Sequence, residues 1–153
     1  MIVGNGFIAQ AFKNSKFIFD DRIIFASGVS NSTLSNNDDI QFTREFDLLK
    51  SFTSTRKTLI YFSTSSIYDK ALFSSPYVKH KLSLEKYIRE SFVSYIIYRL
   101  PVVMGKSVNS NTLTNYLYSH IKSGKQIELH QKASRYLIDV EDVVKYVVKT
   151  CYI

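Results

Sequence analysis

Short apolar runs alternate with segments of helical periodicity along this sequence. Runs rich in Val, Ile, Tyr and Phe predict buried strands at residues 1–3, 22–26, 58–63 and 94–100. The spacing of apolar residues predicts helices at residues 6–14, 39–52, 76–92, 111–123 and 139–150. Strands that alternate with helices favour an α/β fold, with a mostly parallel sheet flanked by helices. A further short strand is expected at residues 126–130, and a polar loop at residues 30–37.

The size and composition of the chain suit one such domain. Its 153 residues are 45% hydrophobic and 14% aromatic, which is enough to bury a core. The single cysteine, Cys151, excludes an internal disulfide and a cysteine-based zinc site, and it suits a reducing compartment. No apolar run approaches the ~20 residues of a membrane helix, and no signal peptide opens the chain. We therefore expect a cytoplasmic protein that does not bind a membrane.

The chain is basic, with a net charge of +7 and a pI of about 9.4. This balance suits an anionic ligand such as a nucleic acid, a phosphorylated metabolite or a dinucleotide. The lysines and arginines are scattered, however, so a solvated surface explains them equally well. Charge alone leaves both interpretations open.

A glycine-rich turn follows the first predicted strand. Residues 4–9 read Gly-Asn-Gly-Phe-Ile-Ala, a G-x-G-x-x-A pattern between a strand and a helix. Glycine lets the backbone turn tightly and approach a diphosphate, while the helix N-terminus offers free N–H groups. A strand–turn–helix corner that needs its glycines for geometry alone is the alternative.

Tyr77 and Lys81 form a Tyr-x-x-x-Lys pattern on the helix predicted at residues 76–92. A spacing of four places both side chains on one helical face. There an ammonium lowers the pKa of a phenol and makes it a proton donor and acceptor. With 11 tyrosines in the chain, a chance pairing on a surface helix is the alternative. Hydroxyl residues at 63–66 end the preceding strand, where α/β sheets bind ligands, although a self-capped turn would explain them too.

The order of these patterns resembles the extended short-chain dehydrogenase/reductase family, that is, the NAD-dependent epimerase/dehydratase family acting on nucleotide sugars. Besides the glycine turn, the similar segments are residues 63–68 (Ser-Thr-Ser-Ser-Ile-Tyr), 76–85 with Tyr77, Lys81 and Glu85, 98–105 (Tyr-Arg-Leu-Pro-Val-Val-Met-Gly) and 135–143 (Arg-Tyr-Leu-Ile-Asp-Val-Glu-Asp-Val). The resemblance implies a single reduced Rossmann-like domain over residues 1–153. In it, the residues from about 106 onward would be the remnant of a substrate-side extension.

The resemblance also implies roles for particular residues. Thr64, Tyr77 and Lys81 would form a catalytic trio. Tyr77 would exchange a proton with a sugar hydroxyl, Thr64 would orient the reacting oxygen, and Lys81 would lower the Tyr77 pKa and bind the nicotinamide ribose. NAD or NADP would be held by Gly4, Asn5, Gly6, Phe7, Ile8, Ala26, Ser27, Gly28, Lys81 and Pro101. The nucleotide-sugar substrate would contact Ser65, Ser66 and Arg135.

The segment that follows the first helix departs from the family. If residues 26–28 (Ala-Ser-Gly) match the family's segment after its fourth strand, residues 16–25 are too few for the strand–helix–strand unit of about 30 residues that should precede it. The second and third strands would then be absent. If residues 22–26 are instead the second strand, the acidic residue expected about 20 positions after the glycines is missing. Neither interpretation gives the usual NAD ribose contact.

The substrate side departs as well. The loop at residues 68–77 is compressed, and the chain ends at Ile153, so most of the family's substrate domain is expected to be absent. Ser65 and Ser66 stand where the family's dehydratases carry an Asp-Glu pair, so dehydration lacks its acid and base. We therefore predict a nucleotide-sugar epimerase or reductase of polysaccharide biosynthesis. A catalytically inactive dinucleotide-binding or partner-binding module that keeps the fold is the alternative.

Three expectations concern partners and ions. The resemblance implies a homodimer through the helix that bears Tyr77, and no nucleic acid is expected as a partner. The three histidines lack metal-ligand spacing, so no metal site is expected. His80 is expected to be a structural residue that faces solvent.

Overall fold

The computed structural model describes residues 1–17, 20–29, 38–105, 113–127 and 134–151. The chain divides into two compact units, residues 1–100 and 101–153. The first unit contains β1 (Ile2–Val3), α1 (Phe7–Asn14), β2 (Arg22–Phe25), α2 (Asp38–Lys50), β3 (Thr58–Thr64), the 3-10 helix η1 (Ser65–Tyr68), α3 (Pro76–Ser91) and β4 (Tyr95–Leu100). Every strand and helix predicted in this unit forms, whereas the loop predicted at residues 30–37 lies outside the described residues.

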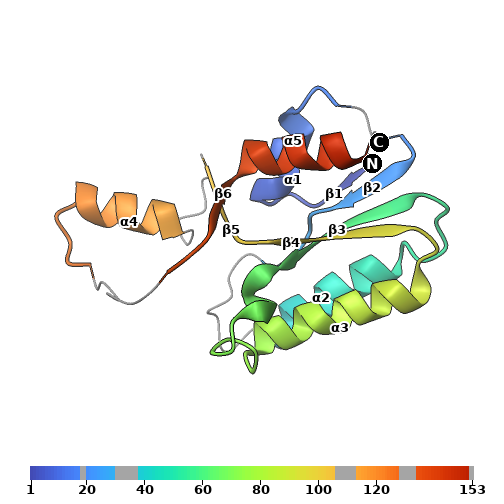
Figure 1. Cartoon of the computed structure of the whole chain (residues 1–153), viewed down its shortest axis with the longest axis horizontal. Helices are drawn as coiled ribbons and strands as arrows, with labels where there is room; N and C mark the ends of the chain where they lie inside the picture. Colours follow the sequence, from blue (N-terminus) through green and yellow to red (C-terminus); the bar gives the residue numbers. More distant parts are fainter. Residues whose placement is uncertain (18–19, 30–37, 106–112, 128–133, 152–153) are drawn as a thin grey trace. The chain divides into compact units, whose positions relative to one another are not determined.

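The strands of the first unit form one parallel sheet in the order β1-β2-β3-β4 (Figure 1). Ile24 of β2 lies opposite Ile2 of β1 and Ile60 of β3, and Ile60 lies opposite Ile96 of β4. Apolar β-branched side chains are therefore in register across the whole sheet. The predicted α/β fold, a mostly parallel sheet flanked by helices, is confirmed.

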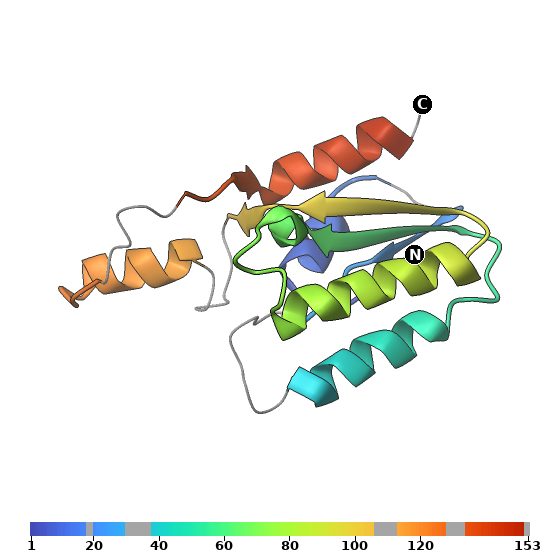
Figure 2. The same ribbon diagram turned by 60° about the horizontal axis from the view of Figure 1, so that its bottom comes forward.

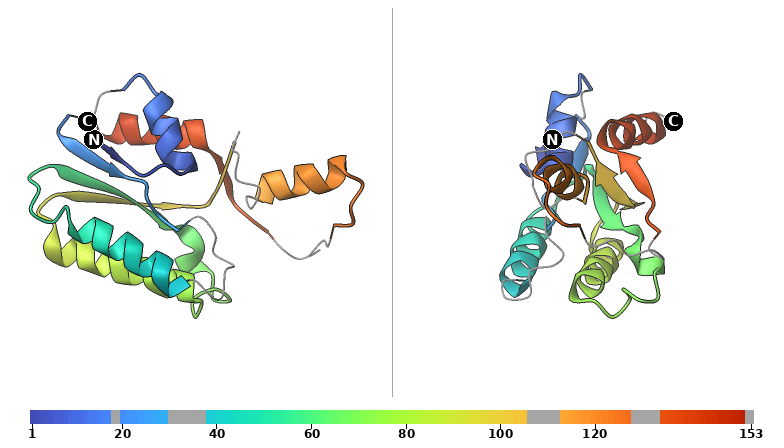
Figure 3. Two further views of the ribbon diagram at one scale, coloured as in Figure 1. Left: turned by 180° about the vertical axis from the view of Figure 1, so that it is seen from behind. Right: turned by 90° about the vertical axis from the view of Figure 1, so that its left-hand side faces the viewer.

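Helices cover both faces of this sheet. Figures 1 and 3 show α2 and α3 on one face and α1 on the other, and Figure 2 shows α2 and α3 side by side along the sheet. Successive side chains of a strand point to opposite faces. The core cluster on the α2–α3 side accordingly takes alternate strand residues and adds helix residues: Ile23, Phe25, Leu49, Leu59, Tyr61, Leu84, Ile88 and Phe92. Tyr61 therefore extends from β3 toward α2 and α3, the direction in which the candidate site lies.

The first crossover has the opposite hand to the next two. All three connections step in the same direction along the sheet, yet α1 crosses on the opposite face from α2 and α3 (Figure 3). Because nearly all crossovers between parallel strands are right-handed, the β1–α1–β2 connection is the exception.

The interpretation in which two strands are absent would explain this exception. In a doubly wound sheet of order 3-2-1-4-5-6, the first helix leads to strands on one side of strand 1, and the chain later returns to the other side. Here residues 15–21 connect α1 directly to β2, which is too short for a strand–helix–strand unit of about 30 residues. The topology therefore favours the interpretation in which residues 22–26 are the fourth strand of such a sheet and the second and third strands are absent.

The second unit contains β5 (Val102–Met104), α4 (Leu113–Lys122), β6 (Leu137–Asp139) and α5 (Val140–Cys151). β5 and β6 pair in parallel, with Val103 opposite Ile138. Both helices were predicted, but β6 was not, and the described residues of the strand predicted at 126–130, Gln126 and Ile127, form no strand. The assignment of the whole chain to a single domain stays a prediction. None of the helices in the described ranges is long and apolar enough to span a bilayer.

Candidate functional site

Gly4 and Gly6 serve different purposes in the turn before α1. Gly4 has a φ of +117°, and a Cβ there would lie 2.4 Å from the carbonyl oxygen of Ala26, so the close approach of β1 and β2 requires glycine. Gly6 is the N-cap of α1 and has an ordinary extended conformation. Within the described residues, the nearest atom to a Cβ added at Gly6 is Ala26 O at 4.0 Å. Packing therefore does not require glycine at position 6, and the space in front of it is open.

The surroundings of this open space suit an anion. The first turn of α1 (residues 7–10) contains no acidic residue, and no described side chain caps its N-terminus, so the positive end of the helix dipole stays available. Lys13 Nζ donates hydrogen bonds to Gly4 O and Asn5 Oδ1, both 2.8 Å long. The turn and the start of α1, with Phe7 and Ile8, thus fit the diphosphate of a dinucleotide.

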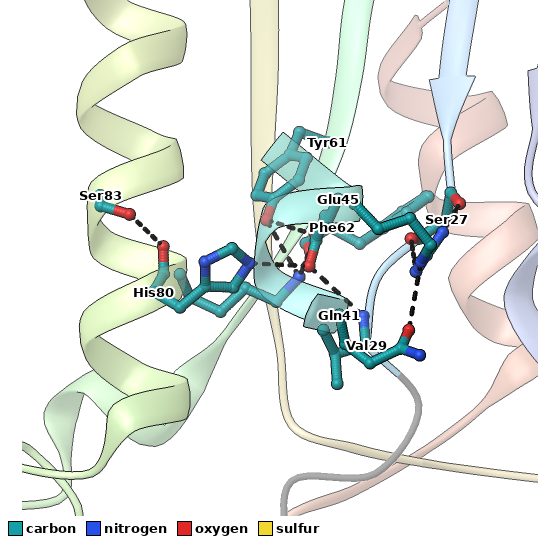
Figure 4. Close-up of polar contacts among 10 residues, drawn as sticks. Ser27, Val29, Gln41, Glu45, Tyr61, Phe62, His80 and Ser83 are labelled. Atoms are coloured by element: carbon teal, nitrogen blue, oxygen red, sulfur yellow. Dashed lines mark hydrogen bonds and ion pairs between the residues drawn. The ribbon is translucent and has the colours of Figure 1, made fainter. Parts of the chain in front are cut away.

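The segment after β2 connects the glycine turn to the helices on the other face. Ala26 N donates to Val3 O at 2.8 Å, and a Cβ on Gly28 would lie 3.1 Å from Lys81 Nζ. Between them, Ser27 accepts two hydrogen bonds of 3.0 Å from the guanidinium of Arg44, one at Oγ and one at its carbonyl oxygen (Figure 4). The predicted cofactor residues 26–28 therefore run from the glycine turn to the predicted catalytic lysine.

Thr64 and Tyr77 lie close together. Thr64 is the last residue of β3, and its Oγ1 accepts a hydrogen bond from Ser66 N at 3.1 Å, while Ser65 and Ser66 begin η1. Tyr77 stands in the first turn of α3, next to the N-cap Ser75. The Thr64 side chain is close enough to the Tyr77 hydroxyl to lower the Tyr77 pKa, although burial and Glu45 outweigh this effect. The fold thus brings two of the three predicted catalytic residues together at the carboxyl end of a parallel strand.

Lys81 is buried one turn after Tyr77, with its Nζ 5.9 Å from the centre of the Tyr77 ring. The ammonium donates to Glu45 Oε1 at 2.7 Å, to Tyr61 OH at 2.9 Å and to Phe62 O at 3.4 Å. An ammonium has three N–H groups, and these three bonds use all of them. The predicted contact between Lys81 and a nicotinamide ribose therefore does not fit this arrangement, in contrast to the glycine turn.

Glu45 of α2 is the centre of this cluster, which we call the Glu45 cluster: Glu45, Tyr61, His80 and Lys81 (Figure 4). Its carboxylate is fully buried. Oε1 accepts from Lys81 and, at 3.0 Å, from Tyr61 OH. Oε2 lies 3.0 Å from His80 Nε2 and accepts from Val29 N at 3.3 Å. A buried carboxylate is stable only with such donors, and here they come from α3, β3 and the segment after β2.

The prediction that His80 faces solvent is wrong. His80 is buried, its ring is stacked on Phe42 with ring centres 4.2 Å apart, and its Nε2 meets Glu45. The reason is Glu45, whose buried carboxylate needs a second donor at Oε2. An exposed position on α3 would leave that oxygen with the backbone N–H of Val29 as its described partner.

The ionisation of the site follows from these contacts. Burial alone would raise the pKa of Glu45, but the hydrogen bond from His80 and the charge of Lys81 outweigh it and lower the pKa to about 2. Burial, followed by the negative charge of Glu45, raises the pKa of Tyr77 to about 12, against a smaller lowering by the hydrogen bond with Thr64. The Tyr61 pKa is also raised, by burial and then by Glu45. The expected lowering of the Tyr77 pKa is therefore wrong for this structure, because burial, and after it the charge of Glu45, raises this pKa.

Sequence reasoning missed Glu45, although the sequence contains a signal for it. Phe42, Glu45, Phe46 and Leu49 follow the i, i+3, i+4, i+7 spacing of one helical face. Phe46 and Leu49 belong to the packing around the core cluster. A glutamate within an apolar stripe is a buried charge, and it predicts a cationic partner on the neighbouring element.

Pro101 and Arg135 belong to the second unit. Pro101 lies between β4 and β5, and Arg135 is an exposed residue shortly before β6. Their predicted contacts with cofactor and substrate stay predictions.

Comparisons with known proteins identify the family and support the fold. The model of the NAD dependent epimerase/dehydratase family matches residues 19–151, a range that begins after the glycine turn. No curated protein matches the sequence. Among solved structures, a UDP-glucuronic acid 4-epimerase from Bacillus cereus, in complex with UDP-glucuronic acid and NAD, is similar with a TM-score of 0.69 at 18% identity, over 86% of this chain and 49% of that one.

A second similar structure is the capsular polysaccharide assembling protein CapF from Staphylococcus aureus. Its TM-score is 0.56 at 20% identity, over 85% of this chain and 36% of that one. The chain thus spans about a third to a half of the length of these structures. At these identities the likeness establishes the fold.

Proposed function

Because this chain belongs to the NAD dependent epimerase/dehydratase family, we propose that it binds NAD or NADP and acts as a nucleotide-sugar epimerase or reductase. The observation that carries the proposal is the position of Thr64 and Tyr77 together at the carboxyl end of β3, where the Thr64 side chain acts on the Tyr77 hydroxyl. This is the edge at which parallel α/β sheets bind ligands. The UDP-sugar and NAD bound by the Bacillus cereus epimerase support a nucleotide sugar as the substrate class.

The proposed roles follow from the positions of the side chains. The nicotinamide would supply or accept the hydride. Thr64 would hold the reacting oxygen of the sugar next to the Tyr77 hydroxyl, and Tyr77 would move the proton. The open space at Gly6 and the start of α1 would hold the diphosphate, with Lys13 as a nearby cation. Ser65 and Ser66, which follow Thr64 directly, would contact the substrate.

Two observations favour a second candidate, an inactive module that binds a dinucleotide or a partner protein. Lys81 already uses its three N–H groups within the chain. In the part of the chain that the structure describes, β1 is also the edge strand on the side where the adenosine half of a dinucleotide is usually bound. In this candidate the fold and the turn remain, but proton transfer is lost.

Calorimetric titration with NAD⁺, NADP⁺ and their reduced forms tests the proposal. We expect micromolar binding that Gly6→Val abolishes, because a Cβ branch would fill the open space. Asn14→Val, at the other end of α1, is the matched control and should leave the affinity unchanged. Absence of binding to the folded chain at millimolar dinucleotide would contradict both enzyme and dinucleotide module, and leave the partner-binding module.

Turnover separates the two dinucleotide-binding candidates. The chain is incubated with UDP-sugars and dinucleotide, and the products are followed by NMR. Conversion that disappears in Tyr77→Phe supports the enzyme. Binding without conversion supports the module. Light scattering of the same samples tests the proposed homodimer.

A further inference from the structure

Lys81 is paired with Glu45, a residue that has no role in the proposed mechanism. The distance between Glu45 Oε1 and Lys81 Nζ is 2.7 Å, and both side chains are almost completely buried. Water screens such a pair very little. At any third group, the ammonium and the carboxylate act together, and their opposite charges largely cancel.

Charged and titratable groups face the Glu45 cluster from α2, β3 and α3. The titratable and charged groups facing the cluster are Glu45 from α2, Tyr61 from β3, and Tyr77, His80, Lys81 and Glu85 from α3. Glu45 accepts hydrogen bonds from Lys81 and Tyr61 at one oxygen, and meets His80 and Val29 N at the other. This set of donors stabilises Glu45 as an anion.

We propose that Glu45 is a positioning residue that holds Lys81 against Tyr61, neutralises its charge, and thereby prevents Lys81 from lowering the proton affinity of the Tyr77 hydroxyl. The inference rests on the proposed function in one respect, the role of Tyr77 as the proton-transfer group. The protonation of Tyr77 itself is a property of the chain without any ligand. A phenol held in this state is a proton donor and a poor base.

The electrostatics of Tyr77 agree with this role. After burial, the charge of Glu45 is the largest influence that raises the Tyr77 pKa, to about 12. An unpaired ammonium at the position of Lys81 would act in the opposite direction. Glu45 therefore controls whether Lys81 can lower the proton affinity of Tyr77.

A pH titration of the full chain labelled with ¹³C at the tyrosine Cζ tests the proposal. Tyr77→Phe identifies the Tyr77 signal among the 11 tyrosines. In the wild-type chain we expect this signal to stay that of a neutral phenol beyond about pH 10, the usual tyrosine pKa. In Glu45→Gln we expect its midpoint to fall by about one pH unit or more, because the negative charge is gone while the shape is kept.

Two variants control this measurement. Glu90→Gln removes a carboxylate from the exposed side of α3 and should leave the Tyr77 titration unchanged. Lys81→Met leaves Glu45 without its ammonium, and the Tyr77 midpoint should stay as high as in the wild type or rise. The double variant Glu45→Gln/Lys81→Met should lie between the two single variants.

Two results would overturn the proposal. One is a wild-type Tyr77 that titrates at or below about pH 10, which would mean that Lys81 dominates despite Glu45. The other is a folded Glu45→Gln whose Tyr77 titrates as in the wild type. If Glu45→Gln does not fold, the wild-type titration still decides, because a Tyr77 midpoint at or below about pH 10 contradicts neutralisation. No dinucleotide is present, so a failure of the proposed function leaves these outcomes unchanged.

Discussion

Glu45 and Glu85 are both fully buried carboxylates, and both have a pKa lowered to about 2 despite burial. Their partners differ. Glu45 is paired with Lys81, whose side chain is 3% exposed. Glu85 accepts two hydrogen bonds from Arg99, of 3.0 and 2.7 Å, and one of 2.6 Å from Arg89. These arginine side chains are 31% and 46% exposed.

Because their partners differ, the two carboxylates have different roles: Glu85 joins elements of the fold, whereas Glu45 belongs to the candidate site. Guanidinium groups stay ionised and remain partly hydrated, so the Glu85 pairs resemble a half-exposed bidentate bridge. With Ser63, which donates to Glu85 at 2.6 Å, they join the end of β3 to α3 and β4. The partners of Glu45 are instead the buried lysine and histidine next to Tyr77. A buried carboxylate therefore joins β3, α3 and β4 at Glu85, whereas at Glu45 it acts on the proton affinity of Tyr77.

The largest expected effect is the loss of the ammonium from the Glu45 cluster. Lys81→Met leaves Glu45 buried without its counter-charge, and we expect the free energy of unfolding to fall by about 3–5 kcal/mol. Urea unfolding followed by circular dichroism measures it. The double variant Lys81→Met/Glu45→Gln removes the unpaired charge and should regain a large part of the loss. A double variant as unstable as the single one would show that packing, rather than charge, dominates this cluster.

Acid should destabilise the fold nearly as strongly. The pKa of Glu45 in the folded chain is about 2, below its ordinary value of 4.5. A lowered carboxyl pKa stabilises the fold above the unfolded value, and this stabilisation is lost as the pH falls through the folded value. We therefore expect about 3 kcal/mol from Glu45 to be lost between roughly pH 4.5 and 2. Unfolding at a series of pH values tests this, and Glu45→Gln should lessen the pH dependence in that window and leave the part contributed by Glu85.

The fold of the first unit could be predicted almost completely, because the signals that determine it are local. The runs at 58–63 and 94–100 form strands β3 and β4 with little change in their bounds, and Ser75 and Pro76 begin α3 where the pattern placed it. The pairing of β5 with β6 was not predictable in the same way. It joins two strands of three residues that are far apart in the sequence, too short for alternation to identify.

The candidate site was predictable in its position and less so in its ionisation. The order of motifs brings Thr64 and Tyr77 together, and the fold does so. The protonation of Tyr77, however, depends on Glu45, which reaches α3 and β3 from a helix about 30 residues earlier in the chain. A pattern of five residues on one helix contains no information about such a neighbour. A buried charge contributed by another element can therefore reverse the expected pKa shift.

A moderate loss of stability is expected when the pairing of Glu85 with Arg99 is weakened. Arg99→Lys replaces a fork that reaches both Glu85 oxygens by a single ammonium. Because Arg89 and Ser63 still donate to Glu85, we expect a loss of about 1–2 kcal/mol in the free energy of unfolding. The same urea unfolding measures it, and the Tyr77 titration should not change. A loss as large as that of Lys81→Met would mean that the two buried glutamates do not differ as their partners suggest.

The smallest effect is expected where the carboxylate is not buried at all. Glu90 on α3 lies 3.8 Å from Lys86, and both side chains are largely exposed. Exposed pairs of this spacing contribute about 0.3–0.5 kcal/mol, and salt screens them. Glu90→Gln should therefore change the unfolding free energy by less than about 0.5 kcal/mol, and by still less in 1 M salt. The three positions form a series in which burial of the cationic partner rises step by step, from Lys86 to Arg99 to Lys81. If Glu90→Gln cost as much as Arg99→Lys, burial would not be the property that ranks these pairs, and the contrast between Glu45 and Glu85 would need another cause.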